Sequence, residues 1–270
     1  TLAHLIAKEM GANMKVTSGP TLEKMGDLAA ILSNLEKGDI LFIDEAHRLN
    51  RQIEEVLYPA LESRKLHLII GKGTGARTFS IDLPPFTLVA ATTRANLLSG
   101  PLRSRFGASF KLDYYKVADI ETILKRSANL LGVKLDNEAV TSIAKASRFT
   151  PRVANRILKR VRDYAEVNNL EEIDVKTAKA TLEMLEIDEL GLEPTDRDLL
   201  RAIIDKFHGG PVGIQTLAAA MNDDRGIIED VYEPYLMSIG LLNRTPSGRI
   251  ATREAYKHLG YKIKEEGTLV

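Results

Sequence analysis

The sequence lacks cysteine and tryptophan, and its charges sum to zero. Of its 270 residues, 37 are Lys or Arg and 37 are Asp or Glu, so bulk positive charge cannot be what binds nucleic acid. The absence of cysteine excludes disulfides, a thiol nucleophile and zinc or iron–sulfur sites held by cysteine. Without tryptophan, stacking of aromatic rings on bases is not indicated.

Long hydrophobic runs are also missing. No apolar stretch approaches the roughly 18 residues that a membrane-spanning helix needs, so we expect no contact with a membrane. No basic segment followed by an apolar one opens the chain, so we expect no signal peptide. Together with the missing cysteines, this pattern fits a protein of the reducing cytoplasm.

Hydrophobic residues make up 44% of the chain and charged residues 27%, which is enough to build a packed core. The length predicts two domains or three small ones. The charges are sorted along the chain: residues 188–240 carry 4 basic and 11 acidic side chains, whereas residues 241–270 carry 6 basic and 3 acidic ones. Residues 145–162 hold seven basic side chains and no acidic one, which is usually a solvated helix face.

The first part of the chain alternates helix and strand patterns. Residues 40–43 form a continuous apolar run, as expected of a parallel strand buried on both faces. We expect further strands at 13–17, 67–70, 78–83 and 87–91, and helices at 1–10, 27–35 and 51–62. The strands at 67–70 and 78–83 would form a hairpin around a glycine-rich loop. The pattern predicts an α/β domain with a parallel sheet over residues 1–112.

The rest of the chain is mostly helical. Helices are expected at 118–131, 137–147, 151–168 and 175–186, which together predict a small all-α domain over residues 113–190. Three more helices, at 196–207, 214–221 and 226–240, precede two short strands at 241–244 and 249–252. Three helices followed by a β-hairpin are typical of a winged-helix domain, here residues 191–270.

Two carboxylates, Asp44 and Glu45, directly follow the apolar run at 40–43. The carboxyl end of a parallel strand is where open α/β folds bind ligands. There, Asp44 could hold Mg²⁺ and Glu45 could orient and deprotonate a water molecule. In the alternative interpretation, Asp44 caps the next helix and Glu45 is solvated.

Three further segments carry candidate polar groups. Thr93 follows the strand at 87–91, beside the expected position of Asp44, and could contact an attacking water or a phosphate. Arg105, next but one to Arg103, could stabilise a transferring phosphoryl group, although surface salt bridges would also explain the pair. Arg152 begins a predicted helix behind Pro151 and could reach a nucleotide, or simply lie on a solvated face.

These segments in this order resemble an AAA+ ATPase, and more closely the RuvB family, the bacterial Holliday-junction branch-migration motors. The resemblance covers essentially all 270 residues and rests on residues 17–20 (TSGP), 42–49 (FIDEAHRL), 91–94 (ATTR), 101–107 (PLRSRFG), 209–213 (GGPVG), 233–236 (EPYL) and 244–249 (RTPSGR). The string at 44–47 also spells the box of another helicase superfamily, but the companion motifs of that superfamily are missing.

The resemblance implies roles for the candidate residues. Asp44 and Glu45 match the Walker B pair, Thr93 matches sensor 1, Arg105 matches the arginine finger, and Arg152 behind Pro151 matches sensor 2. It further implies ATP or ADP and Mg²⁺ as cofactors, a hexameric ring, and double-stranded and Holliday-junction DNA as partners. RuvA and, in the resolution complex, RuvC are the implied protein partners.

One family motif, the phosphate-binding loop that ends in Gly-Lys-Thr, is not in the sequence. Thr1 would directly follow that loop and is assigned to the nucleotide site on this basis. Because backbone N–H groups and the lysine of such a loop hold the phosphates, we expect this chain by itself to bind and hydrolyse ATP poorly.

The resemblance also assigns two interaction surfaces. The hairpin at 67–83, with Leu68, Ile69 and Ile70 on its first strand, would contact RuvA, although an ordinary hairpin packed on its own lobe is the alternative. Around the wing, Arg244, Arg249 and Arg253 would bind DNA phosphates without sequence preference.

Two other functions remain open at this point. The first is a clamp loader or replication initiator of the same fold. The second is a winged-helix DNA-binding module without enzymatic activity.

Overall fold

The computed structural model describes residues 2–70 and 77–261 and divides the chain into two compact units. Unit 1 spans residues 1–111 and unit 2 spans residues 112–270. The buried side chains form three hydrophobic clusters, one in unit 1 and two in unit 2. In the described residues, no helix has the length and apolarity that crossing a membrane requires.

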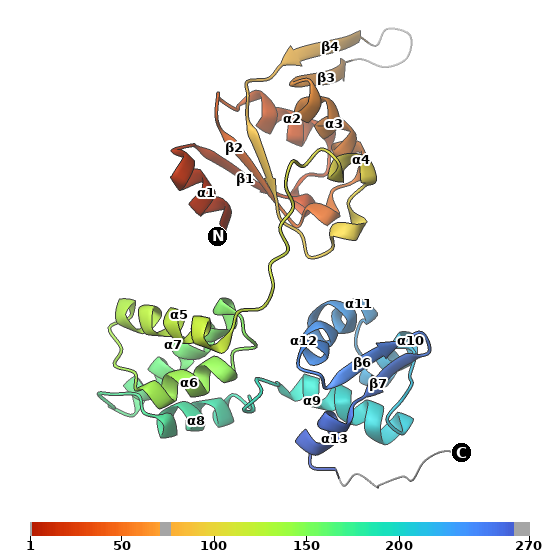
Figure 1. The fold of residues 1–270 in the computed structure, drawn as a ribbon. Coiled ribbons are helices and arrows are strands. Elements are labelled where there is room, and N and C mark those ends of the chain that lie inside the picture. The colour runs from red at the N-terminus through yellow and green to blue at the C-terminus, as the bar shows by residue number, and fades with distance from the viewer. Residues whose placement is uncertain (1, 71–76, 262–270) are drawn as a thin grey trace. The chain divides into compact units, whose positions relative to one another are not determined.

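Unit 1 is built on a parallel sheet of three strands in the order β1-β2-β5 (Figure 1). Its strands are β1 (Met14–Ser18), β2 (Ile40–Asp44), β5 (Thr87–Ala90) and the separate antiparallel pair β3 (Lys65–Ile70) and β4 (Arg77–Asp82). Its helices are α1 (Leu2–Met10), α2 (Met25–Ser33), α3 (Arg51–Glu62) and α4 (Gly100–Arg103), with short 3₁₀ turns η1 (Gly19–Thr21), η2 (Ala46–Arg48) and η4 (Ala95–Leu97).

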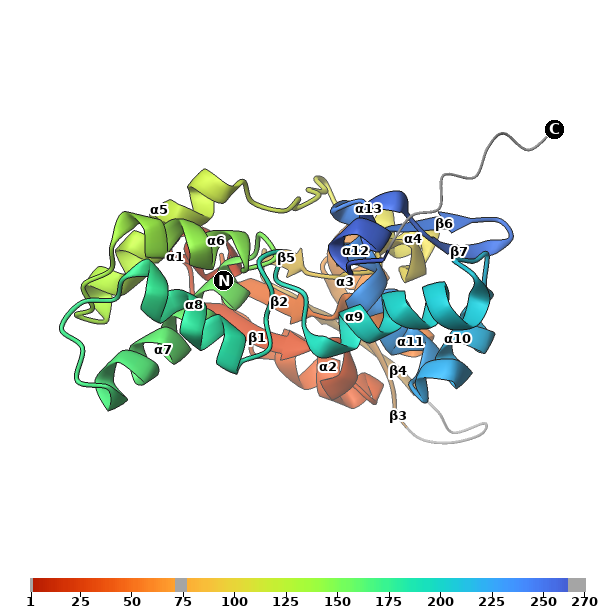
Figure 2. The ribbon, with the colours of Figure 1, turned by 90° about the horizontal axis from the view of Figure 1, so that it is seen from below.

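The central strand β2 is buried on both faces because its four apolar residues alternate between them. Leu41 and Ile43 pack into the cluster that contains residues of α2 and α3. Ile40 and Phe42, also buried, point to the other face. Helices α1 and α2 lie on opposite sides of the sheet in both ribbon views (Figures 1 and 2).

Unit 2 begins with four helices, α5 (Val117–Leu130), α6 (Asn137–Lys145), α7 (Pro151–Val167) and α8 (Val175–Met184). They enclose the second cluster, which we call the lid core. Two of these helices have aspartate caps: the Asp136 carboxylate accepts the N–H of Ala139 at 2.9 Å, and that of Asp174 accepts the N–H of Thr177 at 2.8 Å. Such caps satisfy backbone donors that the first helical turn leaves unpaired.

The third cluster belongs to a winged helix. Its elements are α9 (Pro194–Arg201), which continues as η5 (Ala202–Lys206), α10 (Ile214–Met221), α11 (Arg225–Ile227), η6 (Ile228–Tyr232), α12 (Glu233–Ser238), the wing strands β6 (Leu242–Thr245) and β7 (Gly248–Ala251), and α13 (Arg253–His258). Val212 bridges to Arg249 through two backbone hydrogen bonds of 3.0 and 2.8 Å, which adds a third segment to the wing.

Gly210 allows this third segment to lie against β7. Its φ angle is +98°, and a Cβ atom there would come within 2.3 Å of the carbonyl oxygen of Arg249. Any other residue would therefore push the two segments apart.

The predicted fold class is confirmed: a parallel-sheet lobe, an all-α domain and a winged helix follow one another. Most element bounds differ from the expected ones by one or two residues. Helix α13 was not predicted, and neither were α4 and the 3₁₀ turns. These elements are at most six residues long, too short to show a helical period in the sequence.

Candidate functional site

The carboxyl edge of the parallel sheet brings together the polar residues that follow β2 and β5. Asp44 is the last residue of β2 and is exposed, whereas the four residues before it are buried. Its Oδ1 accepts the N–H of Glu45 at 2.9 Å. The other carboxylate oxygen of Asp44 has no hydrogen bond within the described residues, so the side chain offers a free oxygen at the strand end.

Glu45 has a left-handed backbone conformation, with φ of 49° and ψ of 43°. This conformation is uncommon for a residue with a side chain and breaks the strand sharply. The N–H of Ala46 donates to the carbonyl of Ala91 at 2.9 Å, which ties the turn to the neighbouring strand. The Glu45 side chain is 46% exposed, so its carboxylate stays accessible at the sheet edge.

Gly19, directly after β1, makes room for this turn. A Cβ atom on Gly19 would lie 2.4 Å from the carbonyl oxygen of Glu45 and 3.1 Å from the amide nitrogen of Leu49. Both neighbours are backbone atoms, so neither can move aside without displacing the turn. The segment 17–20 therefore supports the position of Glu45 from the adjacent strand.

His47, in η2, contacts both sides of the sheet edge. Its Nδ1 lies 3.3 Å from Oε2 of Glu45 and 3.0 Å from Oγ1 of Thr92, and its side chain is only 12% exposed. Thr92 Oγ1 also accepts the N–H of Arg94 at 3.0 Å. The predicted residue Thr93 is exposed, and it is Thr92 that bonds to His47.

His47 is not among the site residues predicted from the sequence. The four-residue string that begins at Asp44 is a local signal that contains it, but its contact with Thr92 spans 45 residues.

Arg105 folds onto its own domain. Its guanidinium donates to Oε2 of Glu62 and to the carbonyl of Pro101, both at 2.8 Å, and lies 4.9 Å from the ring centre of Tyr58. Its side chain is 27% exposed, and its Nε is buried without a hydrogen-bond partner. Tyr58 and Glu62 lie one turn apart on α3, so this helix sets where Arg105 is presented.

The residues assigned to the nucleotide by resemblance are not all in the same unit. Thr1 lies outside the described residues. Pro151 is the first residue of α7 in unit 2, and Arg152, the second, is exposed. Their role in nucleotide binding stays a prediction.

The hairpin β3–β4 forms with Leu68 opposite Phe79. Leu68 is partly buried and packs against the core of unit 1, as the alternative interpretation of the hairpin requires, whereas Phe79 is 49% exposed. Ile69 and Ile70 continue β3, but their side chains and the loop 71–76 lie outside the part of the chain that the structure describes.

The wing contains a buried cluster of ions. Arg249 donates from Nε to Oε1 of Glu233 at 2.6 Å and from a terminal nitrogen to Oε1 of Glu229 at 3.0 Å. The side chains of Arg249 and Glu233 are only 7% and 2% exposed. Arg249 therefore pairs with carboxylates inside the domain, an arrangement that does not favour the predicted contact with DNA.

Arg244 faces the same pair of carboxylates from the surface. It lies opposite Arg249 in the register of β6 and β7, and directly opposed residues share a face of the sheet. Its nitrogens are 3.5 Å from Glu229 and 3.9 Å from Glu233, and its side chain is 53% exposed. Arg253, the first residue of α13, is also exposed.

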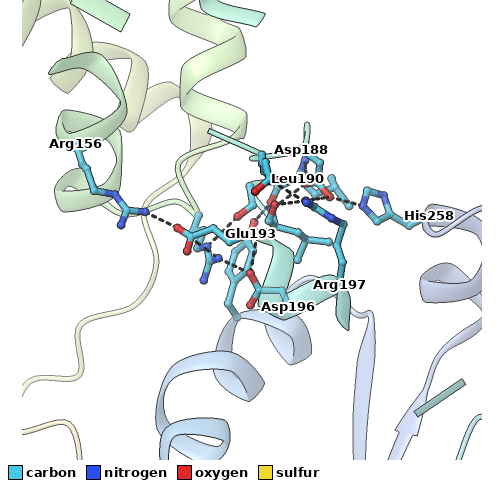
Figure 3. Close-up of polar contacts among 12 residues, drawn as sticks. Arg156, Asp188, Leu190, Glu193, Asp196, Arg197 and His258 are labelled. Carbon is cyan, nitrogen blue, oxygen red and sulfur yellow. Dashed lines mark hydrogen bonds and ion pairs between the residues drawn. The ribbon is translucent and has the colours of Figure 1, made fainter. Parts of the chain in front are cut away.

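A second buried cluster joins the lid core to the winged helix (Figure 3). Arg148, which precedes α7, bonds to the carboxylate of Asp196, donates to the carbonyl of Gly191 at 2.9 Å and stacks 5.2 Å from the ring centre of Tyr235. The Tyr235 hydroxyl donates to the carbonyl of Leu190 at 2.5 Å. Arg148 thus connects three parts of the winged helix and its linker.

The charges of this junction are strongly shielded from water. Burial raises the pKa of Asp196 even though the nearby Arg148 favours its charged form. Burial likewise raises the pKa of Tyr235 to about 12. At the other end of the linker, Nε2 of His258 lies 2.8 Å from Oδ2 of Asp188, which also pairs with Arg197 at 3.7 Å (Figure 3).

Comparison with known proteins places the whole chain in one family. The sequence model of the Holliday junction DNA helicase RuvB P-loop domain matches residues 1–112, that of the RuvB AAA lid domain matches 115–188, and that of the RuvB C-terminal winged helix domain matches 189–260.

Solved structures agree. The chain is similar to the Thermotoga maritima RuvB Holliday junction branch migration motor, with 49% identity, a TM-score of 0.88 and coverage of 97% of this chain and 83% of that one. Two single-substitution mutants of the same RuvB match at 48% and 49% identity, each with a TM-score of 0.89 and 97% of this chain covered, and with 83% and 84% of their own chains covered. These matches exclude the clamp loader, the initiator and the non-enzymatic module. The chain belongs to the RuvB family of Holliday junction DNA helicases, AAA+ ATPases that drive branch migration.

Proposed function

We propose that ATP hydrolysis depends on the sheet edge formed by Asp44, Glu45 and Thr93. The observation that carries this proposal is the position of Asp44 and Glu45 at the carboxyl end of the buried central strand β2, next to the loop after β5. In this role Glu45 orients and deprotonates the attacking water, and Thr93, exposed on the neighbouring loop, contacts the water or the terminal phosphate.

The donor atoms at this edge suit Mg²⁺ that arrives with a nucleotide. In the described residues, no three His, Asp or Glu side chains cluster as a metal site. Mg²⁺ is commonly held by one or two carboxylates together with phosphates and water, and the exposed Asp44 carboxylate fits that pattern. Bound there, Mg²⁺ would neutralise charge on the phosphates.

We propose that Arg105 acts in trans, on the nucleotide held by the next subunit of a hexameric ring. A neighbouring subunit's arginine can stabilise the charge of the transferring phosphoryl group. The contacts of Arg105 with Tyr58 and Glu62 support a finger whose position is set by α3. Arg152 with Pro151, from the lid, and Thr1 would complete the nucleotide site.

We propose that the wing binds duplex and junction DNA through phosphates. Arg244 and Arg253, both exposed, are the cations assigned to this contact. Arg249 serves instead to fix Glu229 and Glu233 behind the wing. Contacts with phosphates carry no base sequence, which suits a motor that moves along DNA.

The partner proteins are assigned to surfaces by family membership. We propose that the hairpin β3–β4, with Leu68, Ile69 and Ile70, binds RuvA, and that the assembly works with RuvC during junction resolution. The exposed Phe79 opposite Leu68 supports an apolar contact on this hairpin. We place this activity in the bacterial cytoplasm, where chromosomal DNA lies.

Glu45→Gln in the full gene product tests the hydrolytic role. We expect a loss of ATPase turnover of about 10² to 10⁴, the usual contribution of a general base, with binding of a fluorescent ATP analogue retained. Glu55→Gln, at an exposed position on α3, is the matched control and should keep full turnover. An ATPase rate near that of the unchanged protein would refute the assignment of Glu45.

Mixed rings test the trans role of Arg105. When Arg105→Ala subunits are mixed with Glu45→Gln subunits, each variant can supply what the other lacks, so junction-stimulated ATPase activity should partly return. The two variants alone should be inactive. If the mixture stays as inactive as its components, Arg105 does not act across subunits.

A further inference from the structure

His47 is a partly buried side chain that contacts the Glu45 carboxylate at the sheet edge. Its Nδ1 lies within reach of two oxygen atoms from the segments that follow β2 and β5, Oε2 of Glu45 at 3.3 Å and Oγ1 of Thr92 at 3.0 Å. The ring is held at 12% exposure, while the Glu45 side chain is 46% exposed. The more exposed carboxylate of Glu45 therefore has a more buried polar neighbour.

The hydrogen count at Thr92 limits what the three groups can do together. Thr92 Oγ1 already accepts the N–H of Arg94, so the conformation of the loop 92–94 fixes this oxygen. Nδ1 carries at most one hydrogen, and the hydroxyl carries one. Protonated Nδ1 can donate to Glu45 or to Thr92, and unprotonated Nδ1 can accept from the Thr92 hydroxyl. Whether His47 Nδ1 can donate a hydrogen bond to Glu45 therefore depends on its hydrogen bond with Thr92.

We propose that His47 is a positioning residue that sets the orientation of the Glu45 carboxylate according to the state of the loop 92–94. The proposal rests on the proposed role of Glu45. Thr93, which is assigned to the phosphate or the attacking water, is the next residue in this loop, between Thr92 and Arg94. When Thr93 moves on binding of the nucleotide, the movement shifts Thr92 Oγ1, then His47 Nδ1, and so changes the orientation of the Glu45 carboxylate.

Conservative variants separate this role from simple packing. The side-chain amide of asparagine places a polar atom near the position of histidine Nδ1, whereas that of glutamine places one near Nε2. His47→Asn should therefore keep much of the activity, and His47→Gln and His47→Ala should not. Because both amides are polar and of intermediate size, a packing role would not favour asparagine over glutamine.

The experiment is steady-state ATP hydrolysis by the full gene product with junction DNA. We expect His47→Ala and His47→Gln to lower kcat about tenfold to a hundredfold, as a misplaced catalytic group does, while KM for ATP changes less than twofold. His47→Asn should recover most of kcat. Arg51→Ala, at an exposed position in the first turn of α3, is the control and should behave like the unchanged protein.

Thr92 provides an independent test of the connection. Thr92→Val removes the hydroxyl, and Thr92→Ser keeps it. If Thr92 acts through His47, Thr92→Val should lower kcat, Thr92→Ser should not, and the double variant His47→Ala with Thr92→Val should be no slower than the worse single variant. Multiplied losses in the double variant would overturn the connection.

The outcomes distinguish this inference from the proposed function. If Glu45→Gln is inactive and all His47 variants keep full kcat, the positioning role is refuted and the role of Glu45 stands. If Glu45→Gln stays active, the proposed function itself fails. Unfolding curves of each variant identify a folding defect, and loss of kcat in proportion to lost stability, equal for Asn and Gln, would also refute the positioning role.

Discussion

The sheet edge of unit 1 and the wing of unit 2 both carry charged residues that the sequence marks as functional, but they treat these residues in opposite ways. At the sheet edge, Asp44 and Glu45 leave a buried strand and reach solvent. At the wing, Arg249 lies inside the domain against Glu233 and Glu229, whereas Arg244, opposite it, reaches solvent. Charged side chains are therefore exposed at the sheet edge, whereas at the wing one of them is buried in ion pairs within the domain.

The difference comes from what determines each environment. A parallel strand that ends at the sheet edge exposes the residues after it through backbone topology alone. In the wing, the partners of Arg249 lie 16 and 20 residues away on helices, and only the packing of strand on helix shows that they meet it. Some acidic residues of the stretch 188–240 therefore form ion pairs with basic residues of the stretch 241–270.

Replacing Arg249 should cause the largest loss of stability. Arg249→Ala removes the close partner of the buried Glu233 carboxylate and leaves Arg244 at 3.9 Å, so we expect a loss of about 3–5 kcal/mol, as for a broken buried ion pair. Urea unfolding measures this loss. Arg201→Ala, which breaks an exposed pair with Asp198, is the control and should cost less than about 1 kcal/mol. Similar midpoints for the two variants would show that Arg249 is not part of the interior.

Gly19→Ala should have the next largest effect, and at the sheet edge. The added Cβ would overlap the carbonyl of Glu45, so we expect a loss of about 1–3 kcal/mol together with a fall in ATPase activity. Gly26→Ala, in α2 where nothing lies within 4 Å, is the matched control and should be neutral or stabilising by up to about 1 kcal/mol. Unchanged ATPase activity in Gly19→Ala would mean that the turn tolerates displacement.

Arg244→Ala should sharpen the contrast within the wing. Because Arg244 is 53% exposed, its loss should cost less than about 1 kcal/mol in stability. Affinity for duplex DNA should fall about equally for all sequences, and the salt dependence of binding should weaken by about one phosphate contact. Titrations at several salt concentrations measure both effects. A loss confined to particular sequences would point to base contacts instead.

The smallest expected effect is on the pH dependence of stability, through Glu229. Burial alone would raise the pKa of Glu229, but hydrogen bonds and charges from Arg225 and Arg249 outweigh it and lower the pKa overall. A lowered carboxyl pKa adds stability above the ordinary glutamate range, and this stability is lost as pH falls through the lowered value. Glu229→Gln should therefore be less stable than the unchanged protein near neutral pH and equally stable in strong acid. Unfolding midpoints across this pH range provide the comparison.

The sequence predicted the long elements of the fold and the exposed part of the site. Strand β2 was recognised from its continuous apolar run, and α7 from Pro151 and its apolar period. The sequence did not predict three contacts: the burial of Arg249, the bond of Arg105 to Glu62 on α3, and the contact of His47 with Thr92. Each depends on residues 16 to 45 positions apart that meet only in the folded chain, which local periodicity does not report.

The junction around Arg148 has a mechanical consequence. Its guanidinium is anchored to Asp196, Gly191 and Tyr235 at once, and His258 is tied to Asp188 at the other end of the linker. Bending between the lid core and the winged helix would break several shielded polar contacts together. These contacts therefore oppose independent movement of the lid core and the winged helix.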